Sequence, residues 1–306
     1  MILSRIGQAL LTLLAATLLV FFLVRLTGNP AYFLLGQDAT QADYARVTNQ
    51  LGLDKPLATQ FFMYLGDLLR GDLGTSFRLH DTPVSSIILD RLPATLAMGG
   101  AALALTIAVA VPLGIYSAYW RGGAVDKFAR FLSALGQAVP SFWLGLTLIL
   151  LFAIKYPILP SGGKGTPVHL ILPAITLAFE PIARLTRLLR SSMIEELSSD
   201  HIKFLRIKGV PEREILWKHA LRNAGLTSLT FVGILSISLL NGSVLVETVF
   251  VWPGLGRLLV ESIHFRDFAI VQGLVFVILA AFIVATLLVD LLYMVLNPRL
   301  RHASYM

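Results

Sequence analysis

Residues 198–223 read SSDHIKFLRIKGVPEREILWKHALRN and form a polar, basic interruption between two strongly apolar segments. Serine and aspartate at the start favour a helix N-terminus. Gly209 favours the C-terminus of the same helix, because glycine reaches positive φ without a Cβ penalty. Pro211 suits the first turn of a second helix, where its missing N–H costs nothing. The stretch predicts two short helices bent about Gly209, a knob on the membrane surface suited to docking another protein.

The expected second helix is amphipathic, and its charges follow the helix macrodipole. Its charged residues run from Glu212 and Glu214 at the start to Lys218, His219 and Arg222 towards the end. Its apolar positions are Ile215, Leu216, Trp217, Ala220 and Leu221. The alternative is an amphipathic surface loop without a partner.

The composition predicts a membrane protein. Hydrophobic residues make up 56% of the 306 residues, charged residues 14%, and the mean hydropathy is +0.76. Soluble domains carry about 25% charged residues, so much of this chain is expected to face lipid. The chain contains no cysteine, which excludes disulfides, cysteine metal ligands and cysteine nucleophiles. A net charge of +7 would suggest nucleic acid in a soluble protein, but its distribution argues against that partner here.

Uncharged apolar runs predict about six transmembrane helices, because some 20 residues cross a hydrocarbon core of about 30 Å. The runs are 6–24, 92–120, 131–154, 165–183, 223–246 and 268–289. The first could instead be a signal peptide, but no clean cleavage site follows it. The fourth is interrupted by Pro173, Glu180 and Pro181. The fold class expected is an all-α polytopic membrane protein.

Charge asymmetry sets the expected orientation. The excess of Lys and Arg lies on the side of the two termini, which the positive-inside rule assigns to the cytoplasm. We divide the chain into a first transmembrane helix (1–26), an outer loop region (27–91) and a five-helix core (92–296), followed by a cytoplasmic tail (297–306). The core contains the cytoplasmic stretch 198–223.

No catalytic motif is present. The sequence lacks a P-loop, a His-Glu-x-x-His motif and a Gly-x-Ser-x-Gly motif, and its six histidines are scattered. We therefore predict no catalytic residue, no metal site and no cofactor in this chain, so that any ATP would be bound by another subunit. A membrane-embedded enzyme is disfavoured for the same reason. An ion-coupled secondary transporter would need a midplane charge or an unwound helix, and usually an internal repeat.

Polar residues in the apolar runs are candidates for a translocation path, since such residues face a cavity or another helix. The candidates are Gln137 in the third run and Ser238, Asn241 and Ser243 in the fifth. Helix–helix packing explains them equally well. Glu180 is expected to pair with Arg184 four residues later, and Asp290 to lie at the cytoplasmic interface.

Several motifs resemble the permeases of ABC importers for dipeptides, oligopeptides and nickel. Asp200, Arg206, Lys208-Gly209 and residues 219–223 are similar to the cytoplasmic "EAA" loop of that family, although residues 203–205 and His201 depart from its pattern. Further matching segments occur in order at 51–57, 71–76, 92–95, 140–143, 247–250 and 253–256. The resemblance runs from the first span to Arg301.

The resemblance implies the type I ABC importer fold, as one half of a permease heterodimer in the bacterial inner membrane. The implied partners are a homologous permease, two ATPase subunits that bind ATP and Mg, and an extracytoplasmic substrate-binding protein. Transport would proceed by alternating access, and short peptides are the expected substrate, with nickel, metal chelates or glutathione-like compounds as alternatives. Residues assigned to ATPase docking are Asp200, Arg206, Lys208, Gly209, Glu212, Ile215, Leu216, His219 and Arg222.

Overall fold

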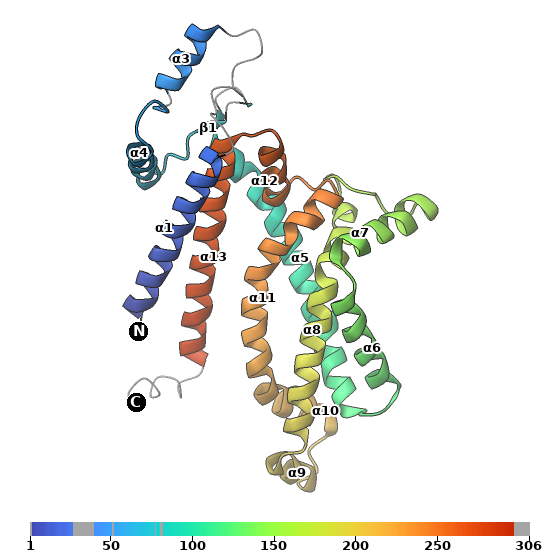
Figure 1. Cartoon of the computed structure of the whole chain (residues 1–306). Helices are drawn as coiled ribbons and strands as arrows, with labels where there is room; N and C mark the ends of the chain where they lie inside the picture. Colours follow the sequence, from blue (N-terminus) through green and yellow to red (C-terminus); the bar gives the residue numbers. More distant parts are fainter. Residues whose placement is uncertain (1, 27–39, 51, 77, 80–81, 297–306) are drawn as a thin grey trace. The chain divides into compact units, whose positions relative to one another are not determined.

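The computed structural model describes residues 2–26, 40–50, 52–76, 78–79 and 82–296, and these residues are mostly helical (Figure 1). Within these ranges the side chains of residues 2–6, 43, 47, 50, 226–227, 230, 237, 240–242 and 288–296 are not described. The chain divides into two compact units. The first comprises Met1–Pro93 and Arg257–Ala285, and the second comprises Ala94–Gly256 and Thr286–Met306.

The first unit joins the N-terminal part of the chain to a late segment. Its elements are α1 (Ile2–Leu26), α3 (Gln41–Gln50), α4 (Leu57–Leu69), β1 (Thr75–Ser76), β2 (Thr82–Pro83), the start of α5 (Val84–Tyr119) and most of α12 (Leu255–His264) and α13 (Phe268–Leu296). The two strands pair antiparallel, with Thr75 opposite Pro83. The buried Ser76 hydroxyl donates to the Asp267 carboxylate at 2.5 Å, which ties β1 to the turn before α13.

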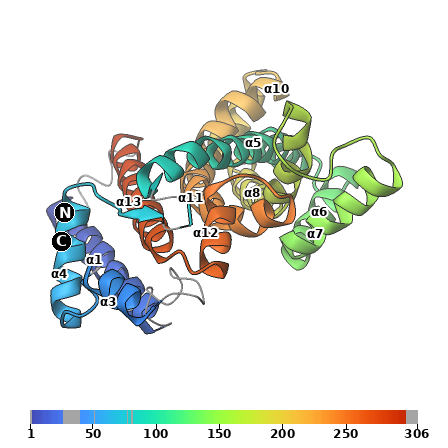
Figure 2. The same cartoon turned by 90° about the horizontal axis from the view of Figure 1, so that it is seen from above.

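The second unit is built around α8 (Ile171–Leu197), which packs against α6 (Ala124–Ala138), α7 (Ser141–Ile149) and α11 (Leu221–Val249), as Figures 1 and 2 show. Its shorter elements are η1 (Leu150–Lys155), η2 (Pro167–Leu170), α9 (Asp200–Ile207), α10 (Glu212–Glu214) and the π-helical segment η3 (Ile215–Ala220). Gly136 allows α6 to approach α8 closely, because a Cβ atom there would overlap Ala183. α8 is therefore the central helix of this unit, and the segment that follows it in sequence contains the candidate site.

The all-α membrane fold is confirmed, but the pattern of spans differs from the prediction. Within the described residues, four helical segments are long and apolar enough to cross a membrane: Gly7–Leu26, Val84–Tyr119, Pro167–Leu197 and Phe268–Leu287. A fifth span results if the bent pair Ala124–Ala138 and Ser141–Lys155 is counted as one. The 29-residue α11 contains the predicted run 223–246, and part of its side chains lie outside the description.

Two predicted helices differ from the structure. The run 131–154 is not one helix, since its two halves are bent by 103°. Pro140 causes the break, because a residue before proline is pushed out of the helical region and Val139 accordingly has φ −88° and ψ 119°. The helix predicted to begin at 92 begins at Val84, so the end of the predicted outer region 27–91 is already helical. Residues 297–306, the predicted tail, lie outside the described residues.

The turn between α11 and α12 is fixed by a buried carboxylate. The Thr95 hydroxyl donates to Glu247 Oε1 at 2.8 Å and accepts from the Leu255 N–H at 2.8 Å. The Trp252 indole N–H donates to the Ala94 carbonyl at 2.8 Å. Gly254 lies directly against the Glu247 carboxylate, which leaves no room for a side chain. The turn is therefore fixed to Ala94 and Thr95 of α5.

Candidate functional site: the α8–α11 hairpin

The hairpin between α8 and α11 contains residues 198–223, the stretch that predicted a docking element. Ser199 occupies the N-cap position of α9, yet its side chain makes no capping bond to the helix. Its hydroxyl donates to the Glu196 carbonyl at 2.6 Å, and the Ser198 hydroxyl donates to the Glu195 carbonyl at 2.7 Å. The two serines thus close the end of α8, and the chain turns sharply into α9.

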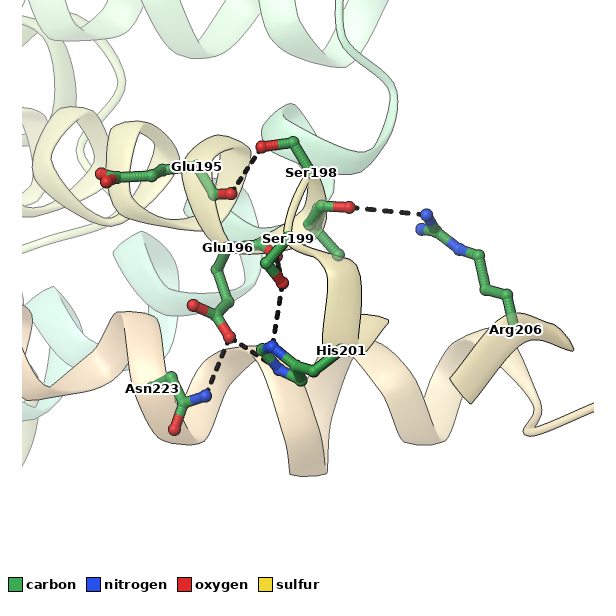
Figure 3. A network of polar contacts seen from close by, with 8 residues as sticks. Glu195, Glu196, Ser198, Ser199, His201, Arg206 and Asn223 are labelled. Carbon is green, nitrogen blue, oxygen red and sulfur yellow. Dashed lines mark hydrogen bonds and ion pairs between the residues drawn. The ribbon is translucent and has the colours of Figure 1, made fainter. Parts of the chain in front are cut away.

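The Glu196 carboxylate joins three helices (Figure 3). Its Oε1 accepts a hydrogen bond from Asn223 Nδ2 of α11 at 2.8 Å and lies 2.9 Å from His201 Nε2 of α9. The Ser199 hydroxyl contacts the other ring nitrogen of His201 at 3.0 Å. Glu196 therefore fixes the first turn of α9 against the ends of α8 and α11. The sequence did not indicate this role, because Glu196 precedes residues 198–223 and Asn223 is 27 positions away.

The turn after α9 follows the prediction at Gly209. Gly209 has φ +76°, and its N–H donates to the Arg206 carbonyl at 3.0 Å. The predicted left-handed glycine is confirmed. Across this turn Arg206 Nε donates to Glu212 Oε1 at 2.8 Å, and the bond raises the pKa of the guanidinium. The turn is thus closed by backbone and ionic contacts.

Local ion pairs cover the hairpin surface. Lys203 lies 2.8 Å from Asp200, and its hydrogen bond holds the pKa of that carboxyl below its ordinary value. Lys218 lies 2.7 Å from Glu214 and lowers the pKa of Glu214 in the same way. Because both pairs are solvent-exposed, they contribute little to the stability of the chain. They favour helix formation. Any binding of a partner at this surface would depend mainly on its apolar groups.

The predicted second helix is not a separate helix. Glu212 begins α10, and the chain continues through η3 into α11 without a break. Ile215 and Leu216 are buried, with exposed fractions of 0% and 4%, and pack with Ile115, Leu189 and Met193 of the chain's own core. Ile215 and Leu216 are thus part of the chain's own core, and their assignment to ATPase docking stays a prediction.

The exposed apolar residues of the hairpin lie mainly on α9. Ile207 is 83% exposed and Phe204 is 55% exposed, while the neighbouring Ile202 is fully buried. The Lys208 ammonium lies 4.4 Å from the centre of the Phe204 ring. One face of α9 thus anchors the helix to the core, and the other presents apolar surface at the end of the second unit (Figure 1). We call Phe204 and Ile207 the α9 patch.

The other assigned docking residues surround this patch or lie further along the hairpin. Asp200 and Lys208 are exposed at the two ends of α9. His219 is half-buried, with Nε2 3.9 Å from Glu214, and Arg222 is exposed on the first turn of α11. The assigned charges are therefore exposed or half-buried on the hairpin, whereas Ile215 and Leu216 are buried.

The two candidate serines of α11 do not share the cavity that Gln137 lines, and the path assignment stays a prediction. Gln137 lies in a cavity beside the α6–α7 break, and neither Ser238 nor Ser243 lines that cavity. The Ser238 hydroxyl donates to the Leu235 carbonyl of its own helix at 3.0 Å, and Ser243 is buried. The side chain of Asn241 lies outside the description. The predicted pair of Glu180 and Arg184 is present, at 2.5 Å.

A second carboxylate that the sequence did not indicate fixes the helix that leads into the hairpin. Asp126, at the start of α6, is buried and accepts from Arg190 Nε of α8 at 2.5 Å and from the Gly122 N–H at 2.9 Å. It links the loop before α6 to the helix that leads into the hairpin. Across the described parts of the chain, no group of three or more His, Asp or Glu residues is placed to hold a metal ion.

Two family models match the chain. The model described as "Binding-protein-dependent transport system inner membrane component" matches residues 110–302. The model described as "Binding-prot-dependent transport system membrane comp, N-term" matches residues 1–99. Together they cover most of the sequence, including the hairpin.

Curated relatives match over nearly the whole chain. A probable D,D-dipeptide transport system permease protein of Escherichia coli (strain K12) is 38% identical, covering 95% of this chain and 94% of the relative. The dipeptide transport system permease protein of the same strain is 36% identical, with 98% of each covered. A glutathione transport system permease protein of Pectobacterium atrosepticum is 40% identical, with 95% of each covered.

Solved structures show the fold. A chain of the MetNI methionine ABC transporter, in inward-facing conformations, superposes with a TM-score of 0.55 at 17% identity, covering 70% of this chain and 97% of that one. A chain of an amino acid ABC transporter gives a TM-score of 0.51 at 16% identity, covering 69% and 94%. The type I importer fold expected from the sequence is thus confirmed.

Proposed function

Because the chain belongs to the family of binding-protein-dependent transport system inner membrane components, we propose that it imports short peptides as one permease subunit of an ABC transporter. Permease relatives named for dipeptide and D,D-dipeptide transport support the substrate class, each over more than nine-tenths of the chain. The chain would provide half of the translocation pathway, and a homologous permease the other half. It would bind no ATP itself and would hold no cofactor.

The α9 patch is the observation on which the docking part of the proposal rests. Its two apolar side chains are held outward on a helix that is tied to the core by Ile202 and by the Glu196 contacts. Burial of an aliphatic or aromatic side chain contributes about 1.5–3 kcal/mol, more than an exposed ion pair does. We therefore propose that α9 inserts into an ATPase subunit, with Asp200, Arg206, Lys208, Glu212, His219 and Arg222 as a charged rim.

This role requires the hairpin and both termini to lie in the cytoplasm. The excess of basic residues on that side of the chain supports the orientation. An external binding protein would then deliver substrate to the opposite face. ATP would shift the permease between inward- and outward-open states only by its differential affinity for those states.

Two alternatives remain distinguishable. Glutathione import is favoured by one relative at 40% identity, and nickel or metal-chelate import is implied by the family resemblance of the sequence. An ion-coupled transporter is the rival from another class, and it would need neither ATP nor companion ATPases.

Uptake by the complete transporter tests the proposal. This chain, its companion permease, the ATPase subunits and the binding protein would be reconstituted in proteoliposomes, with labelled Ala-Ala, glutathione and Ni²⁺ offered separately. We expect Ala-Ala uptake that needs both ATP and the binding protein. A transporter with an inactivated ATPase is the matched control. Uptake driven by an ion gradient without ATP would contradict the proposal, and uptake of glutathione or Ni²⁺ alone would change the substrate.

A further inference from the structure

A cavity of about 260 Å³ lies beside the α6–α7 break and is lined also by α8. Four polar side chains line it: Gln137 of α6, Ser141 of α7, and Thr176 and Glu180 of α8. Sites for drug-sized ligands span roughly 300–1,000 Å³. The cavity is thus large enough for one end of a small peptide and too small for a long one.

Two side-chain donors at this cavity, those of Gln137 and Thr176, are already used within the protein. Gln137 Nε2 donates to the Ser133 carbonyl at 2.7 Å, and the Thr176 hydroxyl donates to the Leu172 carbonyl at 2.8 Å. Because a carbonyl can only accept, the first bond also fixes which end of the Gln137 amide is nitrogen. Among the described residues no hydrogen bond reaches Gln137 Oε1, which leaves an acceptor available.

Glu180 adds a charged acceptor to the same cavity. Its Oε1 lies 2.5 Å from Arg184 Nη2, and its side chain is half exposed. No other ion pair or hydrogen bond to this carboxylate is present within the described part of the chain. Arg184 does not line the cavity. Glu180 thus brings to the cavity lining a carboxylate with one oxygen paired to Arg184.

Free acceptors next to a carboxylate suit a cationic group with several N–H donors. A primary ammonium has three such donors and one positive charge, whereas a ligand carboxylate placed against Glu180 would meet a like charge. The first N–H groups of α7 are not capped by a side chain, so they would pair with the carbonyl that follows the amine in a peptide. We propose that this cavity binds the protonated α-amino group of the transported peptide, an inference that rests on the proposed function.

The absence of cysteine makes the cavity open to a binding assay. Ser141→Cys places a single thiol in its lining, and the rate of alkylation of this chain by N-ethylmaleimide would be measured in the assembled transporter. We expect Ala-Ala to slow the reaction and N-acetyl-Ala-Ala to leave it unchanged. Adding Glu180→Gln should raise the Ala-Ala concentration needed for protection about tenfold or more, the effect of losing a charged hydrogen bond.

Two matched variants separate ligand binding from a structural ion pair. Arg184→Gln breaks the pair but keeps the carboxylate, so protection by Ala-Ala should persist. Glu261→Gln removes an equivalent pair with Arg257, at 2.7 Å on α12; neither residue lines the cavity, so this variant should have no effect. Gln137→Met, which removes the second acceptor, should weaken protection less than Glu180→Gln does.

Four results would overturn the inference: a thiol at position 141 that does not react, no protection by Ala-Ala, equal protection by the acetylated peptide, or the same loss in Arg184→Gln as in Glu180→Gln. Uptake measurements on the wild-type transporter distinguish this failure from failure of the proposed function. If the wild type imports Ala-Ala with ATP while any of these results holds, only the amine site is wrong. If it imports no Ala-Ala, the peptide function itself fails.

Discussion

Truncating Ile207 should separate docking from folding more sharply than any other change in the hairpin. Ile207 is 83% exposed, so Ile207→Ala should alter the stability of this chain by less than about 0.5 kcal/mol. If Ile207 is buried in an ATPase subunit, its loss should weaken association by about 1.5–3 kcal/mol. That range corresponds to about 10- to 150-fold in the dissociation constant.

Leu216, in contrast to Ile207, should affect the stability of the chain rather than docking directly. It is 4% exposed within the chain's own core, so Leu216→Ala should cost about 2–5 kcal/mol of stability through a lost contact and a cavity. Any effect on docking would then follow from loosening of the hairpin. Lys203→Ala, which removes only an exposed pair with Asp200, should change neither quantity appreciably.

The assay titrates purified ATPase subunits onto the permease pair in nanodiscs and measures thermal unfolding of the same samples. Ile207→Ala should lower affinity at unchanged melting temperature, and Leu216→Ala should lower the melting temperature. Wild-type affinity in both Ile207→Ala and Phe204→Ala would refute the assignment of the α9 patch as the contact surface.

Three further predictions concern the hairpin and the orientation of the chain. Gly209→Val should impair ATP-coupled uptake and Gly209→Asn should largely preserve it, because valine disfavours the observed φ of +76° and asparagine tolerates it. Equal uptake by the two variants would show that the left-handed turn is not required. Glu196→Ala should speed hydrogen exchange in α9 selectively, since both His201 and Asn223 lose their common partner; exchange unchanged by mass spectrometry would show that other contacts hold the helix. Lys164→Cys should react with an impermeant thiol reagent added outside cells and Arg213→Cys should not, and labelling of the latter from outside would reverse the orientation.

The sequence predicted features governed by local backbone chemistry. Gly209 at positive φ and the helix ending at Ile207 follow from glycine placed after an amphipathic run. The break at Pro140 was not predicted because an uncharged apolar run continues through a single proline, although the restriction on Val139 is just as local.

Contacts between distant residues could not be predicted in this way. The bonds from Glu196 to Asn223 and from Asp126 to Arg190 join residues 27 and 64 positions apart, and no local pattern specifies such partners. The apolar face of residues 215–221 was recognised, but an amphipathic pattern is the same whether the face packs against the chain's own core or a partner. Only the packing of Ile215 and Leu216 distinguishes the two.

The buried turn around Glu247 also constrains the timing of biosynthesis. Trp252 bonds to Ala94 across 158 residues, and Leu255 bonds to Thr95 across 160. At about 5–20 residues per second, a ribosome needs roughly 8–30 s to make the chain between these partners. Throughout that interval the Ala94 carbonyl and the Thr95 hydroxyl of α5 are without these partners, and a chain stalled before Trp252 would never form either bond.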